Sequence, residues 1–101
     1  MSDEKELREL DLFCAEKVMG WTAMPGYRNV KAEAFHPTTN DADAMAVFRK
    51  CGEKYYGSIA IHFENGEWSV GQAYEGPNAI KAKGPTLPLA ICLFAKRLFE
   101  K

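Results

Sequence analysis

The side chains best suited to acid–base catalysis in this chain are its two histidines, His36 and His62. The alternating segment around His62 predicts a hairpin strand in which Ser69 lies directly opposite. A histidine beside a serine hydroxyl could act as base and nucleophile. The sequence places no carboxylate to orient the imidazole and offers no evident oxyanion donor, so we expect His62 to be a surface or hydrogen-bonded residue. We predict no catalytic residue and no enzymatic activity.

The three cysteines, Cys14, Cys51 and Cys92, are far apart in the sequence. They form no CxxC pair and no Cys/His cluster of the kind that holds zinc. Each falls inside a helical pattern beside apolar neighbours, which indicates a reduced, buried cysteine that behaves as a small hydrophobic residue. The glycines show no phosphate-loop or dinucleotide spacing. We therefore predict no metal site and no cofactor.

Aromatic residues at the ends of elements or in loops are the remaining candidates for binding chemistry. Aromatic faces and an arginine can stack a base and pair with a phosphate. The same residue types also form protein-interface hot spots, or simply cover a small core. The candidate ligand-binding residues are Trp21, Tyr27, Arg28, His36 and Tyr74.

Apolar residues at three- and four-residue spacing predict the helices that position these side chains. The predicted helices span residues 4–19, about 40–51 and 87–100. Thr39 or Asn40 should cap the second helix and Thr86 the third. Gly20 and Gly52 are expected to end the first and second helices. The third helix is apolar nearly all round, so it is either buried on most sides or presents a face to a partner, including a second copy of the chain.

A central β-hairpin is the clearest predicted element. Alternating strands at about 55–63 and 67–74 flank Asn65-Gly66, and Asn-Gly is the strongest short-range hairpin signal. This turn sets Phe63 opposite Trp68 on an apolar face that should pack on a helix. The opposite face is small and half polar, and could be open or closely covered. Residues 79–83 could form an edge strand. Residues 27–30 suggest a short strand or an extended loop, and the alternation of polar and apolar residues at 31–35 hints at a strand.

These elements predict a single α+β domain over residues 1–101, with a small antiparallel sheet packed between helices as an α-β-α sandwich. The chain carries 13 Lys and Arg against 14 Asp and Glu, and its positive charges are scattered. That balance argues against nucleic-acid binding. The polar N-terminus does not resemble a signal peptide, and no apolar run is long enough to span a membrane. We expect a cytoplasmic protein.

Three blocks of sequence together resemble one known family. They are AEKVMGW at residues 15–21, PTTNDADAMAVF at residues 37–48 and TLPLAICLFAKRL at residues 86–98. In this order they resemble the phage ABA sandwich domain family, small proteins of bacteriophages and prophages. The resemblance implies a sheet layered between helices and a life in the bacterial host cytoplasm. It carries over no set of catalytic residues.

Three functions remain open from the sequence. We favour a non-enzymatic binding protein that a phage or prophage uses against a host process, as a counter-defence. Its target would be a small nucleotide-type signal, which it would sequester, or a host protein, which it would block. The second function is a structural or assembly module that forms oligomers through its last helix. The third, and least favoured, is a small hydrolase that uses His62.

Overall fold

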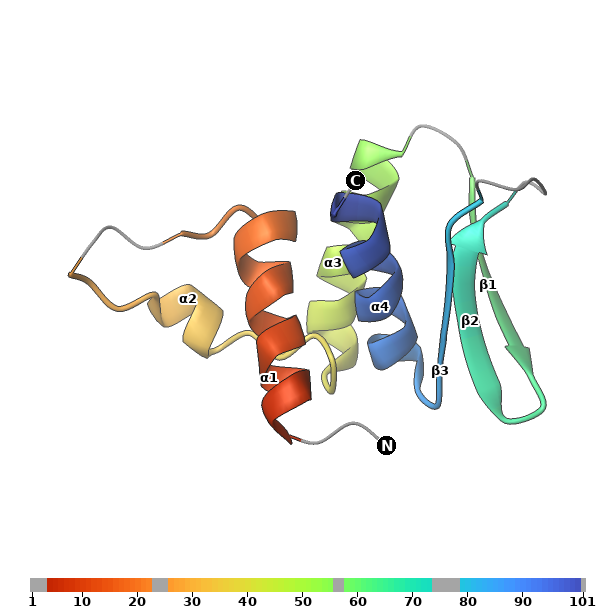
Figure 1. The fold of residues 1–101 in the computed structure, drawn as a ribbon, viewed down its shortest axis with the longest axis horizontal. Helices are drawn as coiled ribbons and strands as arrows, with labels where there is room; N and C mark the ends of the chain where they lie inside the picture. Colours follow the sequence, from red (N-terminus) through yellow and green to blue (C-terminus); the bar gives the residue numbers. More distant parts are fainter. Residues whose placement is uncertain (1–3, 23–25, 56–57, 74–78, 101) are drawn as a thin grey trace.

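The computed structural model describes residues 4–22, 26–55, 58–73 and 79–100. The structure is of the α+β class that the sequence predicts (Figure 1). In chain order the elements are α1 (Glu4–Phe13), a π-helical turn η1 (Cys14–Val18), α2 (Val30–Glu33), α3 (Asp41–Lys54), β1 (Ile59–Glu64), β2 (Glu67–Gln72), β3 (Lys81–Gly84) and α4 (Leu87–Phe99).

The first predicted helix is confirmed, with its last turns wound as a π-helix. Gly20 follows it with a φ of +77°, a left-handed conformation that glycine adopts without steric cost. The third predicted helix is also confirmed. The Thr86 side chain accepts a hydrogen bond from the Leu89 N–H, and Pro88 lies in the first turn, where its missing N–H is not needed.

The second helix begins as predicted and ends later. The Asn40 side chain caps it by accepting a hydrogen bond from the Asp43 N–H at 2.9 Å. Gly52, expected to end the helix, lies inside it, and the helix runs to Lys54. Tertiary contact explains the extra residues, because the Lys54 ammonium lies 5.0 Å from the centre of the Phe99 ring on α4.

The hairpin has the predicted turn and register. Asn65 and Gly66 have φ values of +54° and +80°, as a two-residue hairpin turn with both central residues at positive φ requires. Phe63 pairs with Trp68, and the pairing continues along both strands. The first strand starts later than expected: Tyr55 is the C-cap of α3, and β1 begins at Ile59. The edge strand expected at 79–83 is present as β3, and Tyr74 lies outside the described residues.

The strand suggested at residues 31–35 is wrong, since the short helix α2 spans Val30–Glu33, whereas residues 27–29 lie in a loop, one of the two expected alternatives. The Asn29 side chain caps α2 by accepting a hydrogen bond from the Ala32 N–H. The buried apolar residues of this segment are three positions apart, as on a helix, and not two positions apart, as on a strand. Ala32 and Phe35 are both buried, and they face the core from one side of the turn.

The layers are arranged differently from the expected sandwich. Helices α1, α3 and α4 all lie on one side of the β1–β2–β3 sheet, and α4 contacts β2 and β3 directly (Figure 1). In the part of the chain that the structure describes, no helix covers the opposite face of the sheet. Eight of the 13 residues of α4 are buried, which accounts for its strongly apolar sequence within a single copy of the chain.

A buried carboxylate fastens the loop before α3 to the first helix. Asp11 is 4% exposed, and its Oδ1 accepts hydrogen bonds from the Thr38 N–H at 2.9 Å and from the Thr38 hydroxyl at 2.8 Å. Arg8, one turn earlier, donates to the carbonyl oxygens of Ala32 and Phe35. Together these bonds hold the segment that carries α2 against α1.

Candidate functional site

Trp21, the first of the predicted binding residues, is largely a structural residue. Its ring packs edge-on against Phe35, with centroids 4.9 Å apart, and the Lys31 ammonium lies 5.5 Å from the ring centre. The Trp21 carbonyl accepts a hydrogen bond from the Asn29 side chain at 2.6 Å. These contacts close the loop between η1 and α2.

Tyr27 and Arg28 lie on the same connection, just before α2, and both are exposed. Tyr27 is 75% exposed. Arg28 forms a two-pronged ion pair with Glu33, with N–O distances of 3.1 and 2.6 Å. The hydrogen bond from Arg28 lowers the pKa of Glu33, so this carboxylate keeps its charge at neutral pH. Glu33 engages the Nε and one Nη of Arg28, and its charge offsets that of the guanidinium towards an approaching anion.

His36 lies beside the buried carboxylate of Asp11. Its Nδ1 lies 3.5 Å from the Asp11 Oδ2, and its backbone N–H donates to Asp43 at 2.9 Å. The structure therefore places Trp21 and His36 in contacts that hold the fold, and leaves Tyr27 exposed. These residues do not line the hollow described next.

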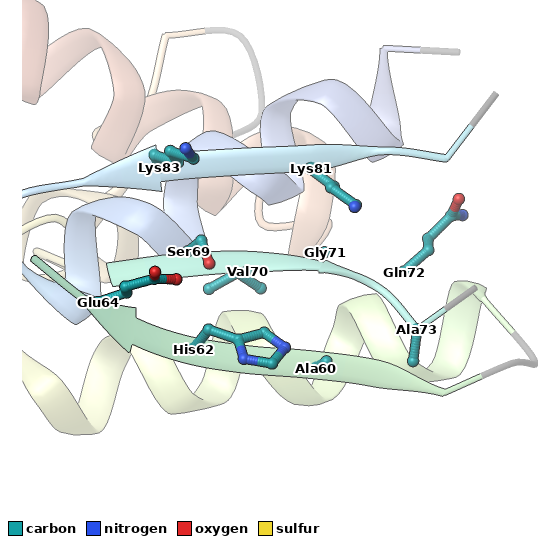
Figure 2. A pocket seen from close by; sticks show the side chains of 10 residues that line it. All are labelled: Ala60, His62, Glu64, Ser69, Val70, Gly71, Gln72, Ala73, Lys81 and Lys83. Carbon is teal, nitrogen blue, oxygen red and sulfur yellow. The ribbon is translucent and has the colours of Figure 1, made fainter. Parts of the chain in front are cut away.

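The open face of the sheet carries a hollow of about 540 Å³ (Figure 2). Two rows of side chains run across the three strands, because the register aligns them. The first row is Lys83, Ser69 and His62, and the second is Lys81, Gly71 and Ala60.

Gly71 shapes the centre of this hollow. A Cβ atom at this position would lie only 2.7 Å from Cγ of Lys81 and 3.2 Å from the carbonyl oxygen of Ile80. Glycine therefore leaves the space in which the Lys81 side chain leans from β3 towards β2 (Figure 2). The lysine stem lies beside Gly71, and the Lys81 side chain lines the hollow.

Charge is unevenly distributed over the open face. Lys81 and Lys83 are exposed on β3, while Glu64 and Glu67 oppose one another beside the hairpin turn. Because strands lie about 4.8 Å apart, His62 on β1 is about 10 Å from the backbone of Lys83 on β3. Lys83 shares a smaller hollow with Glu64 and Glu67 at the turn end, so an anion is attracted to β3 and is repelled by the two carboxylates at the Lys83 end.

The cross-strand pair of His62 and Ser69 is present as predicted. Among the described residues, no hydrogen bond joins the imidazole to the Ser69 hydroxyl or to a carboxylate. The pair lies on an exposed surface, where water screens both groups. What the geometry offers at this position is a histidine and a hydroxyl that can donate hydrogen bonds to a ligand.

The three cysteines come together in the core, although the sequence separates them widely. Each is fully buried, and the thiols of Cys14 and Cys92 share a hydrogen bond. Burial raises the pKa of Cys51 to about 12, and the bond to Cys14 raises that of Cys92. The prediction of free, buried cysteines is confirmed. Across residues 4–22, 26–55, 58–73 and 79–100, no group of three His, Cys, Asp or Glu side chains could hold a metal ion.

Comparison with known families decides where this fold belongs. Residues 12–95 match the phage ABA sandwich domain, a stretch that covers most of the chain. The chain belongs to the phage ABA sandwich domain family. The match includes the residues of the open sheet face and all but the last turn of α4. No curated protein and no solved structure shows significant similarity to it.

For this phage ABA sandwich domain, the sequence pattern located only part of the candidate site. It identified the His62–Ser69 pair and the small, half-polar face. It treated Lys81 and Lys83 only as protection for an exposed edge, because their position beside Ser69 and Gly71 depends on the pairing of β3 with β2. Among the described residues, no helix is long and apolar enough to cross a membrane.

Proposed function

We propose that this phage ABA sandwich domain acts without catalysis, by binding an anionic ligand on the open face of its sheet. The observation that carries the proposal is the uncovered hollow with Lys81 and Lys83 along one side. Two lysines on the same face of one strand suit a ligand with more than one phosphate oxygen to pair. His62 and Ser69 complete the row with hydrogen-bonding groups.

A nucleotide-type signal fits this chemistry, and its sequestration would serve a phage as a counter-defence. Its phosphates would lie along β3 towards Lys81, since Lys83 shares a hollow with Glu64 and Glu67, and its base would extend over the half of the sheet near Ala60. Small side chains there leave space above the strands. The loop residues Tyr27 and Arg28 remain a second possible contact surface for such a ligand.

Thermal unfolding tests the proposal with defined probes. Sodium pyrophosphate, ATP and cyclic di-AMP should each be titrated at constant ionic strength, since a ligand that binds only the folded state stabilises it by RT ln(1 + [L]/Kd). A probe present at about 100 times its Kd adds about 2.7 kcal/mol. At least one probe should raise the melting temperature of the wild-type protein in a saturable way.

Paired variants show whether the effect belongs to the sheet. A Lys81→Ala/Lys83→Ala double variant should lose the ligand-dependent rise. A Lys5→Ala/Lys17→Ala variant removes the same charge from exposed positions on α1 and η1, and it should keep the rise. Equal loss in both variants would show non-specific charge attraction, and no rise with any probe would contradict the proposal.

A further inference from the structure

The two edge strands of the sheet, β1 and β3, differ in how well their outer backbone groups are protected from pairing with another strand. On the β3 edge, the Arg97 side chain donates a hydrogen bond to the Lys81 carbonyl at 2.6 Å, and both lysines of the strand are exposed. Lysines and a covered carbonyl are common ways to keep other strands from pairing with an edge. The β3 edge is therefore protected from further strand pairing.

The β1 edge has no such protection among the described residues. The Ala73 N–H bonds to the Ser58 carbonyl, and in an antiparallel ladder the residues that bond to the partner alternate along the strand. The backbone groups of Ile59, Ile61 and Phe63 therefore point away from β2. They form a row of N–H and C=O groups in the arrangement that another strand would pair with.

Apolar side chains are exposed beside this row. Phe63 is 60% exposed and Ile61 is 37% exposed, on the face of the sheet that is turned towards the helices. Met45 on α3 is 39% exposed. Phe63 rests against Trp68, with ring centroids 4.7 Å apart. Below Trp68 a hollow of about 410 Å³ opens between α3 and α4, lined in part by Ala44, Met45, Trp68, Leu87 and Ile91.

Behind the sheet, α4 makes the main helix contacts, with β2 and β3, and α3 packs against α4. Figure 2 shows that α3 lies on the β1 side of α4. Met45 of α3 and Trp68 of β2 line the same hollow. A fourth strand beside β1 would therefore have the exposed side chains of Ile61, Phe63 and Met45 next to its inner face.

We propose that the β1 edge binds an extended segment of a partner protein as a fourth strand. Main-chain hydrogen bonds to Ile59, Ile61 and Phe63 give such a segment its affinity, and alternate side chains give it specificity. Its inward side chains are apolar, because they face Met45 and the hollow below Trp68. Its outward side chains are polar, since they continue the open face. A helix or a nucleic acid would leave the edge N–H and C=O groups unpaired.

A second copy of this chain fits the edge less well. Two-fold pairing of β1 with its own copy would bring a second layer of helices to the same side of the joined sheet, whereas a lone strand brings only its own side chains to this edge. The inference rests on the edge and on α3, and it stands or falls separately from the anion site on the open face.

Selection from a random library of ten-residue peptides displayed on yeast tests this proposal. The selected peptides should alternate apolar and polar residues, and a synthetic copy should bind with one peptide per protein. Methylation of its backbone nitrogens at every second residue, in the register that pairs with β1, should weaken binding at least ten-fold. Methylation in the other register should have a smaller effect.

Two variants locate the binding surface. Ile61→Lys and Phe63→Lys each place a charge on the exposed edge, and both should weaken peptide binding at least ten-fold. Val30→Lys is the matched control, because Val30 is 66% exposed on α2, away from the sheet, and it should leave binding unchanged. Four outcomes would each overturn the proposal. The library yields no binder, or it yields peptides that do not alternate apolar and polar residues. Binding survives both edge variants, or the wild-type protein is a dimer that Ile61→Lys converts to a monomer.

Discussion

Replacing Asp11 by alanine should destabilise this protein far more than the loss of one helix residue would suggest. The carboxylate is 4% exposed and accepts two hydrogen bonds from Thr38, itself 3% exposed. Without it, a buried N–H and a buried hydroxyl lose their acceptor, and each unsatisfied group costs about 1–3 kcal/mol. We expect the free energy of unfolding to fall by about 3 kcal/mol, a large part of the 5–15 kcal/mol typical of a domain.

Urea unfolding followed by tryptophan fluorescence measures this loss, with an unchanged m-value as the check that the unfolding transition remains comparable. In a domain of this size the melting temperature should fall by about 12–24 °C, at 4–8 °C for each kcal/mol. Glu9→Ala is the matched control, since Glu9 is exposed on the same helix, and should change the free energy by about 0.5 kcal/mol or less.

A double-mutant cycle then assigns the loss to the contact itself. Thr38→Val removes only the hydroxyl, so it should cost about 1 kcal/mol in the wild-type background and less in Asp11→Ala. The reasoning would be refuted if Asp11→Ala cost less than about 1 kcal/mol, or if the two substitutions were simply additive.

Two further predictions follow from the core and from the sheet. The thiol pKa of Cys51 rises from 9.0 to about 12 on folding, and that of Cys92 is also raised. The unfolded chain therefore releases these protons first, so the contribution of these thiols to stability does not change below pH 9, and urea titrations should show stability that falls from pH 9 to 12. Retained stability at pH 11 would contradict the buried placement of these cysteines. Gly71→Ala should lower the free energy of unfolding by about 1–2 kcal/mol and should displace the Lys81 side chain. Calorimetry should therefore show much weaker binding of any ligand that binds the open face. Unchanged affinity would mean that Lys81 does not contact the ligand.

Local signals predicted the elements that depend on local chemistry. Asn65-Gly66 fixed the hairpin register because both residues can adopt positive φ, and Asn40 and Thr86 located two helix starts because their side chains bond the first free N–H groups. The strand suggested at residues 31–35 was wrong, because the three-residue spacing of Ala32 and Phe35 is hidden within an alternating pattern.

Tertiary arrangement was harder to predict for physical reasons. The small face of the hairpin is compatible with open solvent or with close covering, so its exposure became known only once all three large helices were placed on the other side. The lysines of the candidate site depend on the pairing of β3 with β2 across an intervening loop. The hydrogen bonds of Asp11 join it to Thr38, 27 positions along the chain, and no local sequence pattern predicts a contact over that separation.

The most direct test of the binding surface is an amide ¹H–¹⁵N NMR titration of the protein with sodium pyrophosphate. We expect the largest shift changes at His62, Ser69, Gly71 and Lys83, with saturation at one ligand per chain. Changes centred on Tyr27 and Arg28 would move the site to the loop before α2, and a spectrum that does not change up to millimolar ligand would contradict the proposal that the open sheet face binds anions.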